Sequence, residues 1–470
     1  MVDSFLYSRI QQNFQFTFTH EQEIALHQLV GFILSGKSDQ LFLLKGFAGT
    51  GKSSLIGAVV KTLHGLEQNI VLLTPTGRAA KVFSSYSEFP ASTIHRKIYR
   101  QKAMFSNTFS ISDNRHKNTL FLVDEASMIA NDSNDQIAFG SGSLLDDLIE
   151  YVYSGDGCKL VLIGDTAQLP PVGQTISPAL EKERLEGYGL EVIEVKLTEV
   201  VRQATESGIL SVASSIRRDI EQDEVFDYPI LSVNGMKDVT RLPADELVET
   251  INSCYDRDGI DSVLVVCRSN KNANIYNKGI RGRILFKEEE IESGDRLMVV
   301  RNNYFWKQTP DKETFIANGD LVELKRVRRL SEMYGFQFAD VTLSFVDYEM
   351  ELDAKIVLDT LHTEAPSLTA EMRKNLYDAV FADYAANYKT KKAIMEQMRK
   401  DPWLNALQVK YAYAMTCHKA QGGQWKHVFV DQGYLIQEML GMDYYRWLYT
   451  AFTRATDHLY LVNFSEECFK

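Results

Sequence analysis

The chain has 470 residues, of which 45% are hydrophobic and 24% are charged, so it exceeds one ordinary core and should form two or more domains. No apolar run approaches a membrane span, and the N-terminal residues lack the pattern of a signal peptide, which favours a cytoplasmic protein. The five cysteines are scattered singly and give no disulfide framework, zinc pair or iron–sulfur spacing. The net charge of −12 argues against a protein coated in nucleic acid but allows a local basic groove.

Short apolar runs alternate with helical stretches over the first 200 residues, which is the pattern of a parallel sheet covered by helices. These runs are 41–44, 70–73, 120–123 and 160–163. A second α/β region begins with the apolar run 262–267, and runs 426–430 and 458–462 fit strands of that second sheet. We therefore expect an α/β protein with two such sheets.

Two segments interrupt this rhythm. Residues 100–118 are polar and lie between two motifs. Within 325–405, residues 336–346 and 349–358 alternate like antiparallel strands, and 369–398 read as a long helical stretch. We expect both segments to be insertions into the α/β cores rather than linkers.

Residues 46–53 read Gly-Phe-Ala-Gly-Thr-Gly-Lys-Ser and fit the P-loop pattern. The glycines let successive N–H groups point at phosphate oxygens, Lys52 would reach the β- and γ-phosphates, and the Ser53 hydroxyl would ligate Mg²⁺. A chance glycine-rich turn is the alternative. An apolar run before the loop and a helical stretch after it favour the phosphate site, since a helix N-terminus attracts anions.

Two further strand ends carry polar groups. The run 121–123 ends in Asp124 and Glu125, which would hold Mg²⁺ through water and polarise the attacking water. The run 162–163 leads into a turn where Gln168 could sense the γ-phosphate. Taken alone, either could be an ordinary strand end.

Arg202 and Arg454 lie in two short motifs later in the chain, Leu-Thr-Glu-Val-Val-Arg-Gln and Tyr-Thr-Ala-Phe-Thr-Arg-Ala. Guanidinium groups stabilise charge on a transferred phosphoryl group, although a single arginine more often forms a surface ion pair. If both arginines lie on the second α/β domain, hydrolysis requires that domain to close on the first.

Four segments are candidates for nucleic-acid contacts: 74–81, 92–96, 301–304 and 416–422. Hydroxyls, backbone N–H groups and small residues after strands can bind phosphates without reading bases. The interleaved basic and aromatic residues of 96–100 suit a single strand through charge and stacking. Helix caps and a solvated basic face are the structural alternatives for each segment.

The order of these motifs resembles that of superfamily 1 helicases, and most closely of group 1B, which includes the RecD-like and phage Dda-like helicases. The resemblance covers nearly the whole chain. It implies two RecA-like P-loop NTPase domains, a small 1B insertion that carries a strand-separating pin, and a mainly β, SH3-like 2B insertion with extra helix. The implied limits are 1–99 and 119–196 for domain 1A, 100–118 for 1B, 197–324 and 406–470 for 2A, and 325–405 for 2B. Phe105 and Phe109 are candidate pin aromatics, with core packing as the alternative for both.

The resemblance also implies roles for individual residues. The adenine-reading glutamine corresponds to Gln22. The nucleotide-binding set is Gln22, Gly46, Ala48, Gly49, Thr50, Gly51, Lys52, Ser53, Ser54 and Gly422, of which Gly422 links the ATP site to DNA. The catalytic set is Lys52, Asp124, Glu125, Gln168, Arg202 and Arg454, and Ser53 and Asp124 would hold the metal. The positions expected near the single strand are Thr76, Thr93, His95, Asn303, Thr416 and His418.

The function implied is an ATP-dependent and Mg²⁺-dependent DNA helicase that moves 5′ to 3′ on single-stranded DNA and unwinds forks. It would act as a monomer in replication, recombination or repair, with protein partners from those processes. Three alternatives stay open: a DNA translocase subunit of a larger nuclease complex that does not unwind, an RNA helicase of the same superfamily, and a P-loop switch or binding module.

Overall fold

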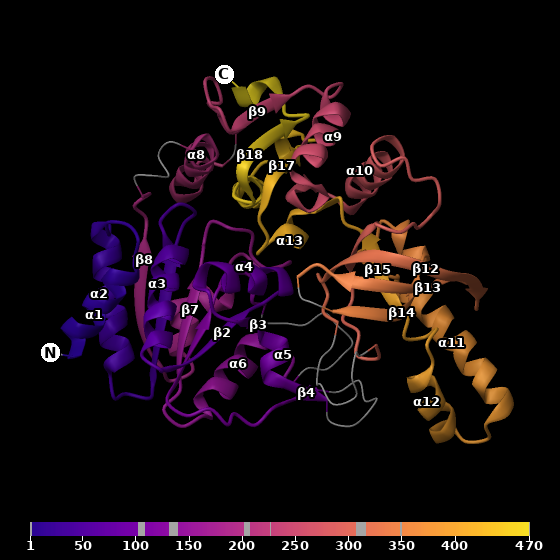
Figure 1. Cartoon of the computed structure of the whole chain (residues 1–470), viewed down its shortest axis with the longest axis horizontal. Coiled ribbons are helices and arrows are strands. Elements are labelled where there is room, and N and C mark those ends of the chain that lie inside the picture. Colours follow the sequence, from indigo (N-terminus) through magenta and orange to yellow (C-terminus); the bar gives the residue numbers. More distant parts are fainter. Residues whose placement is uncertain are drawn as a thin grey trace.

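The computed structural model describes residues 2–101, 109–130, 140–201, 207–225, 227–306, 316–347 and 350–469. This part of the chain forms two open sheets, a closed barrel and a two-stranded hairpin. In Figure 1 the first sheet lies at the lower left, the second at the top and the barrel at the right.

The first sheet has six parallel strands in the order β3-β2-β6-β7-β1-β8. Its central strands are buried along almost their whole length, because helices cover both faces. The apolar runs at 41–44, 70–73, 120–123 and 160–163 lie within four of these strands, as the sequence predicts. The strands are β1 (Gln40–Gly46), β2 (Asn69–Thr74), β3 (Ala91–Thr93), β6 (Thr119–Val123), β7 (Lys159–Gly164) and β8 (Glu191–Leu197).

Two apolar cores flank the first sheet. One is built with helices α1 (Val2–Asn13), α2 (His20–Leu34), α3 (Lys52–Gly65) and α4 (Gly77–Ser87). The other is built with α5 (Ile94–Ile98), α6 (Leu144–Tyr153) and α7 (Lys182–Glu186). Helix α3 follows β1 through residues 47–51, so the P-loop lies at the carboxyl end of the sheet, where such α/β folds bind ligands.

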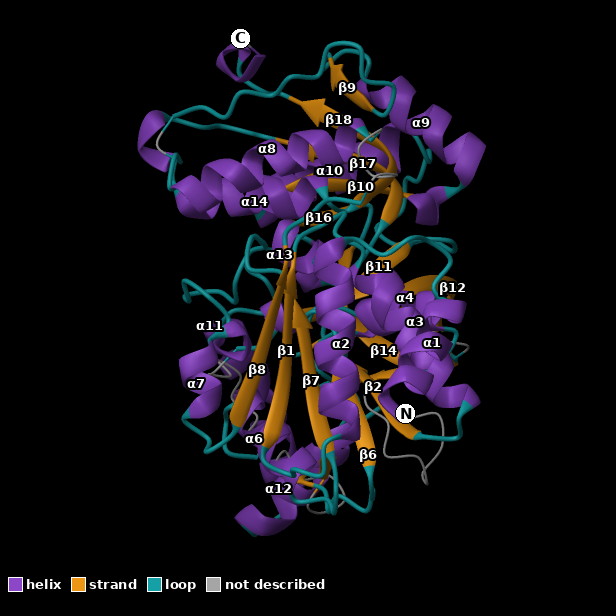
Figure 2. Cartoon of the chain, turned by 90° about the vertical axis from the view of Figure 1, so that its left-hand side faces the viewer, coloured by secondary structure: helices purple, strands orange, loops and turns teal. Residues whose placement is uncertain are grey.

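The second sheet has five parallel strands in the order β16-β10-β17-β18-β9. Its strands are β9 (Val239–Leu242), β10 (Val263–Cys267), β16 (Ala414–Thr416), β17 (Trp425–Asp431) and β18 (Ala455–Val462), which confirms the strands expected at 262–267, 426–430 and 458–462. Helices α8 (Gly208–Gln222) and α14 (Met442–Phe452) share a core on one face, with α13 (Cys417–Ala420) beside them. Helices α9 (Leu247–Asp258) and α10 (Asn270–Arg283) lie in the core on the other face. Figure 2 shows this layer above the first sheet, with α13 between the two.

A closed five-stranded barrel is inserted in the chain between strands β10 and β16 of the second sheet. Its strands are β11 (Arg296–Val299), β12 (Leu321–Met333), β13 (Phe336–Phe345), β14 (Glu351–Val357) and β15 (Leu407–Tyr411). All neighbours are antiparallel except β14 and β15, which are joined by helices α11 (Ala370–Asn387) and α12 (Lys391–Lys400). These two helices pack against one end of the barrel in a separate small core.

The barrel differs from the limits expected from the sequence. It uses β11 before residue 325 and β15 after residue 405, and β12 begins before 325. Every position of strand β15 is buried, although its sequence Leu-Gln-Val-Lys-Tyr alternates apolar and polar residues. The helical stretch 369–398 is two helices rather than one.

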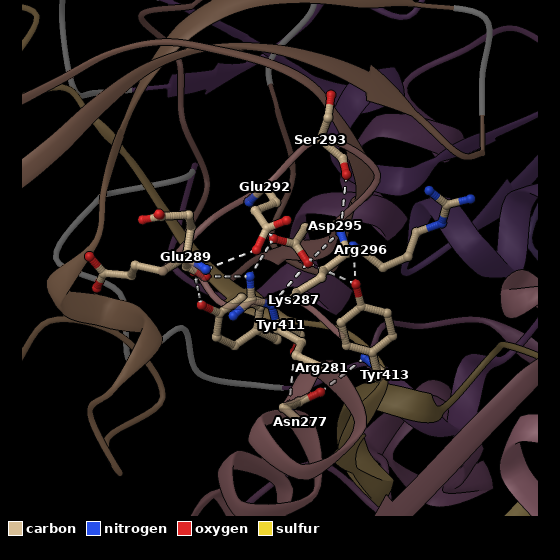
Figure 3. Close-up of polar contacts among 11 residues, drawn as sticks. Asn277, Arg281, Lys287, Glu289, Glu292, Ser293, Asp295, Arg296, Tyr411 and Tyr413 are labelled. Carbon is tan, nitrogen blue, oxygen red and sulfur yellow. Dashed lines mark hydrogen bonds and ion pairs between the residues drawn. The ribbon is translucent and has the colours of Figure 1, made fainter. Parts of the chain in front are cut away.

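A buried polar cluster joins the barrel to α10 (Figure 3). Asp295, immediately before β11, accepts two hydrogen bonds of 3.0 Å from Arg281 of α10, and the Lys287 ammonium lies 3.1 Å away. Tyr413 donates to the same carboxylate at 2.9 Å. Because Asp295 is fully buried, these contacts fix the barrel to the second α/β unit. The second unit is the second sheet with its helices, and the first unit is the first sheet with its helices.

A short hairpin occupies the segment expected as insertion 1B. It pairs β4 (Tyr99–Gln101) with β5 (Phe109–Ile111). Phe109 is buried, and its ring centroid lies 4.2 Å from that of Tyr304. Phe105 lies outside the described residues. Among the helices of the described part, none is long and apolar enough to cross a membrane.

Candidate active site

The P-loop adopts the tight curl that its glycines allow. Gly49 and Gly51 both have φ of 77°, a left-handed conformation that favours glycine. The Lys52 ammonium donates to the carbonyl oxygens of Gly46 and Phe47, the second at 2.8 Å. Ser53 and Ser54 are exposed in the first turn of α3, whereas Thr50 is buried and donates to the Phe47 carbonyl. The loop therefore presents one ammonium and the free end of a helix at one place.

Gln22 packs against this loop. Its Nε2 donates to the Thr50 carbonyl at 2.9 Å, and its Oε1 accepts from the backbone N–H of Thr19. Thr19 and Gln22 form the capping box of α2, and Gln22 is only 1% exposed. The first of these contacts holds α2 to the P-loop, and the second closes the N-terminus of α2.

The two carboxylates expected from the sequence follow β6. Asp124 accepts from the Glu125 backbone N–H at 2.8 Å, and Glu125 has a left-handed φ of 55°. Burial raises the pKa of both carboxyl groups above their usual range, and their mutual repulsion adds to this for Glu125. The Tyr86 hydroxyl donates to Asp124 Oδ2 at 2.6 Å and also contacts the Ser53 side chain. Tyr86 therefore bridges the two side chains expected to hold a metal.

Arg454 reaches this group from the second sheet. It is 4% exposed and donates to the carbonyls of Thr450 and Gly423, at 3.0 Å and 3.2 Å. Its Nη1 lies 3.9 Å from Glu125 Oε1 on the first unit. A guanidinium held by its own unit thus faces a carboxylate of the other, as a site closed by two domains requires.

The turn after β7 carries several polar contacts between the units. Thr450 of α14 accepts from the Leu169 backbone N–H at 2.8 Å, and Gln421 donates to the Leu169 carbonyl at 2.7 Å. Gln168 is buried in this turn, and its Oε1 has no hydrogen-bond partner among the described residues. A buried acceptor that has no partner among the described residues fits the sensing role expected of Gln168.

Tyr449 joins the same turn to the P-loop. Its hydroxyl donates to Asp165 Oδ2 and accepts from the Ala48 backbone N–H, both at 2.7 Å. Phe47 extends this contact, because it packs in the core of the second unit beneath Arg217, whose guanidinium lies 4.6 Å from the ring centroid.

Several residues expected near a single strand have local structural roles as well. Thr76 and Thr93 are the N-caps of α4 and α5, and each accepts a backbone N–H at 3.3 Å. His95 is half-buried, with its ring centroid 5.6 Å from that of Tyr99, and Asn303 donates to the Asn405 carbonyl. Thr416 and His418 lie at the start of α13, with His418 exposed.

Gly422 lies against α4 and not against the P-loop. A Cβ at Gly422 would approach the Ala79 Cβ to 2.7 Å and Thr76 Oγ1 to 3.2 Å. Its φ of 74° adds a second reason for glycine. The second unit thus touches the N-terminal turn of α4 at a position where only a hydrogen fits.

Barrel carboxylates hold basic residues of the first unit. Asp347 pairs with Arg78 at 2.9 Å and with Lys81 at 3.5 Å, and Asp320 lies 3.6 Å from Arg96. Arg78 also stacks over Trp425, with 5.1 Å between the guanidinium carbon and the ring centroid. The three cations belong to segments that the sequence marks as candidates for DNA contact.

Two family models match the chain over the regions that carry this geometry. Residues 17–228 match an AAA domain, and residues 411–462 match a UvrD-like helicase C-terminal domain. The curated relatives include the ATP-dependent RecD2 DNA helicase of Deinococcus radiodurans, 24% identical over 94% of this chain and 48% of that protein. They also include the ATP-dependent DNA helicase dda of Enterobacteria phage T4, 24% identical over 82% of this chain and 86% of that protein. These matches support a RecD/Dda-like superfamily 1 helicase.

A solved structure was also similar to this helicase. The Pif1 helicase from Bacteroides in complex with ADP-AlF3 and single-stranded DNA aligns with a TM-score of 0.47 and 15% identity, over 97% of this chain and 95% of that one.

The helicase's expected ATP-site residues are brought together in part. Lys52, Asp124 and Glu125 share mutual electrostatic contacts, and Arg454 joins them across the interface. Arg202 lies outside the described residues. No group of three or more His, Cys, Asp or Glu side chains that could hold a metal occurs in the described ranges.

Sequence reasoning missed Tyr86, Asp165 and Tyr449. Asp165 lies in the same motif as Gln168, and Tyr449 lies in the same motif as Arg454. Their presence as polar residues in these motifs is the signal that could have found them. Tyr86 lies late in α4 and has no motif around it. Its contacts with Asp124 and Ser53 arise because the fold places α4 beside the P-loop helix α3.

Proposed function

We propose that this helicase hydrolyses ATP between its two α/β units, moves 5′ to 3′ along single-stranded DNA and separates duplex at forks. The observation that carries the proposal is the approach of Arg454 to Glu125 across the interface. A site completed by both units makes hydrolysis depend on their relative position, which is what a motor needs and what a one-domain switch does not need.

The nucleotide roles are proposed for residues whose chemistry fits. Lys52 and the backbone N–H groups of 48–53 would hold the phosphates, with Glu125 as the group that orients the attacking water and Gln168 as the γ-phosphate sensor. Hard oxygen ligands suit Mg²⁺, and the Ser53 hydroxyl and the Asp124 carboxylate share a contact with Tyr86. The metal would neutralise charge on the phosphates. Arg202 is proposed as a second cation, and Gln22 as the adenine contact.

The motor cycle follows from where the arginine is held. Arg454 is fixed by Thr450 and Gly423 of its own unit, so it gains or loses its contacts with the nucleotide only as the units move. ATP binding would draw the units together, and hydrolysis would release them. Because the barrel is fixed to α10, it would move with the second unit.

The DNA path is proposed to run over Thr76, Thr93, His95, Asn303, Thr416 and His418. Contacts of hydroxyls and cations with phosphates are independent of sequence, as movement along DNA requires. The choice of DNA over RNA is supported by relatives that are named DNA helicases. The 5′ to 3′ direction rests on the family resemblance. The hairpin β4–β5 is proposed as the pin, and its buried Phe109 packs in the core of the first unit rather than against duplex. The helicase is proposed to act as a cytoplasmic monomer in DNA replication, recombination or repair.

Two assays test this function. Unwinding is measured on forked DNA that carries only a 5′ tail or only a 3′ tail, and we expect activity on the 5′-tailed substrate. Preference for the 3′ tail would contradict the direction, and ATP hydrolysis without unwinding would favour a translocase. Stimulation by RNA but not by single-stranded DNA would favour an RNA helicase.

The second assay tests the ATP site. Lys52→Ala should abolish DNA-stimulated ATP hydrolysis, because the loop loses its phosphate cation. Lys61→Ala is the matched control, since Lys61 lies on the same helix α3 and pairs with Glu88 on the surface. Full turnover in Lys52→Ala would refute the assignment of the site.

A further inference from the structure

One buried hydroxyl joins three elements of the two units. Tyr449 lies on α14 of the second unit and is 1% exposed. Its hydroxyl donates to Asp165 Oδ2 and accepts from the Ala48 backbone N–H, both at 2.7 Å. Ala48 belongs to the P-loop after β1, and Asp165 to the turn after β7, and these two strands are neighbours in the first sheet.

The hydroxyl is a donor and an acceptor at the same time, which requires it to keep its proton. Burial and the nearby Asp165 carboxylate hold the pKa of Tyr449 well above its usual range. The proton therefore stays between Tyr449 and Asp165, and the oxygen lone pair remains for Ala48. A hydrogen bond to a carboxylate in a buried site is among the stronger ones.

Asp165 also holds the turn that carries Gln168, which we call the sensor turn. Its other oxygen, Oδ1, accepts from the Ala167 backbone N–H at 2.9 Å, and its carbonyl accepts from the Gln168 N–H at 3.4 Å. The carboxylate thus shapes the turn that presents Gln168.

Tyr449 is also connected to Arg454 through α14. The next residue, Thr450, accepts Arg454 Nε at its carbonyl at 3.0 Å and binds the Leu169 N–H through its hydroxyl. A shift of α14 therefore moves the arginine relative to Glu125. The P-loop and the sensor turn therefore both contact α14 through the Tyr449 hydroxyl.

We propose that Tyr449 is a positioning residue that couples the P-loop and the Gln168 turn to the placement of Arg454; this rests on the proposed ATP-driven function. It touches the P-loop backbone and not the reacting atoms. Its loss should therefore lower the rate of hydrolysis more than the affinity for nucleotide. Small misplacements of a catalytic group reduce rates strongly, and we expect a decrease of kcat on the order of tenfold or more.

The variant that tests this is Tyr449→Phe, which keeps the ring and removes both hydrogen bonds. The matched control is Tyr445→Phe on the same helix. Tyr445 is 2% exposed and donates to the Asp227 carbonyl at 2.8 Å, so its hydroxyl has no partner in the first unit among the contacts described here. Both variants lose one buried phenolic hydroxyl from α14.

Three readouts are compared: DNA-stimulated kcat, the Kd of ATP, and hydrogen exchange of the P-loop amides in the protein without nucleotide. We expect Tyr449→Phe to lower kcat about tenfold or more, to leave the Kd within about threefold, and to speed exchange across 47–55. Tyr445→Phe should change none of the three by more than about twofold.

A kcat of Tyr449→Phe within twofold of wild type, or equal losses in both variants, would overturn the proposal. Unchanged exchange across 47–55 would overturn it as well. If wild type itself lacked DNA-stimulated hydrolysis, the proposed function would fail, while the exchange comparison would still decide the coupling. Asp165→Asn is the second variant if Tyr449→Phe does not fold, because it weakens the same contact from the first unit, and the same directions are expected.

Discussion

Arg454 Nη1 and Glu125 Oε1 lie 3.9 Å apart, on opposite sides of the interface between the two α/β units. The arginine is held by backbone carbonyls of its own unit, and Glu125 by the left-handed turn that follows β6. The guanidinium is therefore held in place without Glu125. The distance within the pair therefore depends on how closely the two units approach, and the proposed function assigns the cation to the charge that develops on the phosphate.

Arg454→Ala should lower DNA-stimulated kcat by roughly 10³-fold, since arginines that stabilise phosphoryl transfer contribute on this order. Arg454→Lys should recover little, because an ammonium cannot reproduce the fork that binds two carbonyls and faces Glu125. Steady-state hydrolysis with saturating single-stranded DNA measures both. Arg241→Ala is the control, since Arg241 pairs with Glu466 at the surface of the same unit. Near-normal rates in Arg454→Lys would mean that only charge is needed.

Asp347→Asn should strengthen binding of single-stranded DNA. Asp347 is almost fully buried and neutralises Arg78 and Lys81, both in a segment expected to contact DNA. Removing its charge frees two cations for phosphate, and a gain of about 1 kcal/mol corresponds to roughly fivefold in Kd. Fluorescence anisotropy of a labelled oligonucleotide at fixed salt measures this.

The control for this change is Asp353→Asn, which removes the same charge from an exposed pair of the barrel with Arg328. A general effect of net charge would strengthen binding equally in both variants. Weaker binding in Asp347→Asn would mean that the Asp347 contact supports the DNA path rather than competing with phosphate.

Local patterns were sufficient to place the residues that are proposed for the first half of the ATP site. The P-loop and the Asp124–Glu125 pair each need only a strand, a turn and a few residues of fixed spacing, so the sequence predicted them with their flanking strands. Gln22 has a structural role that was not predicted, although its spacing from Thr19 indicates it. Thr19 and Gln22 have capping-box spacing, and in the structure Gln22 closes that box while binding Thr50.

Contacts between distant segments could not be predicted in the same way. Ala48 and Tyr449 are 401 residues apart in sequence and meet only because two sheets face each other. The barrel strands outside 325–405 could not be assigned for a related reason. Strand β15 does alternate apolar and polar residues, but its neighbours β11 and β14 are distant in sequence, so the alternation alone does not show which sheet it joins.

Asp295→Asn should destabilise the junction of the barrel and α10 by about 3 to 5 kcal/mol, because it leaves the buried Arg281 and Lys287 without their carboxylate. Chemical unfolding followed by tryptophan fluorescence measures this, since Trp306 and Trp403 lie beside the barrel. Asp353→Asn again serves as the control, and an exposed pair contributes about 1 kcal/mol or less. A loss for Asp295→Asn no larger than this control would mean that the cluster is satisfied by water or by its remaining hydrogen bonds.

Lys410 should make stability depend on pH in the alkaline range. It is 6% exposed, its ammonium donates to the Thr363 carbonyl, and burial lowers its pKa to about 8. In the unfolded chain a lysine has a pKa of about 10.4. Between about pH 8 and pH 10.4 the unfolded chain holds a proton that the folded chain has released, so the contribution of Lys410 to stability rises with pH.

The measurement is the free energy of unfolding of wild type minus that of Lys410→Met, taken from pH 7.5 to pH 9.5. We expect this difference to rise by about 1 to 2 kcal/mol, since one unit of pKa corresponds to about 1.4 kcal/mol. Lys410→Arg keeps its charge throughout this range and should show no such rise relative to Lys410→Met. Lys419 lines the same cavity as Lys410, and both reference variants retain it, so its titration cancels in the comparison. A flat difference for wild type would mean that the Lys410 ammonium keeps its proton in the folded chain.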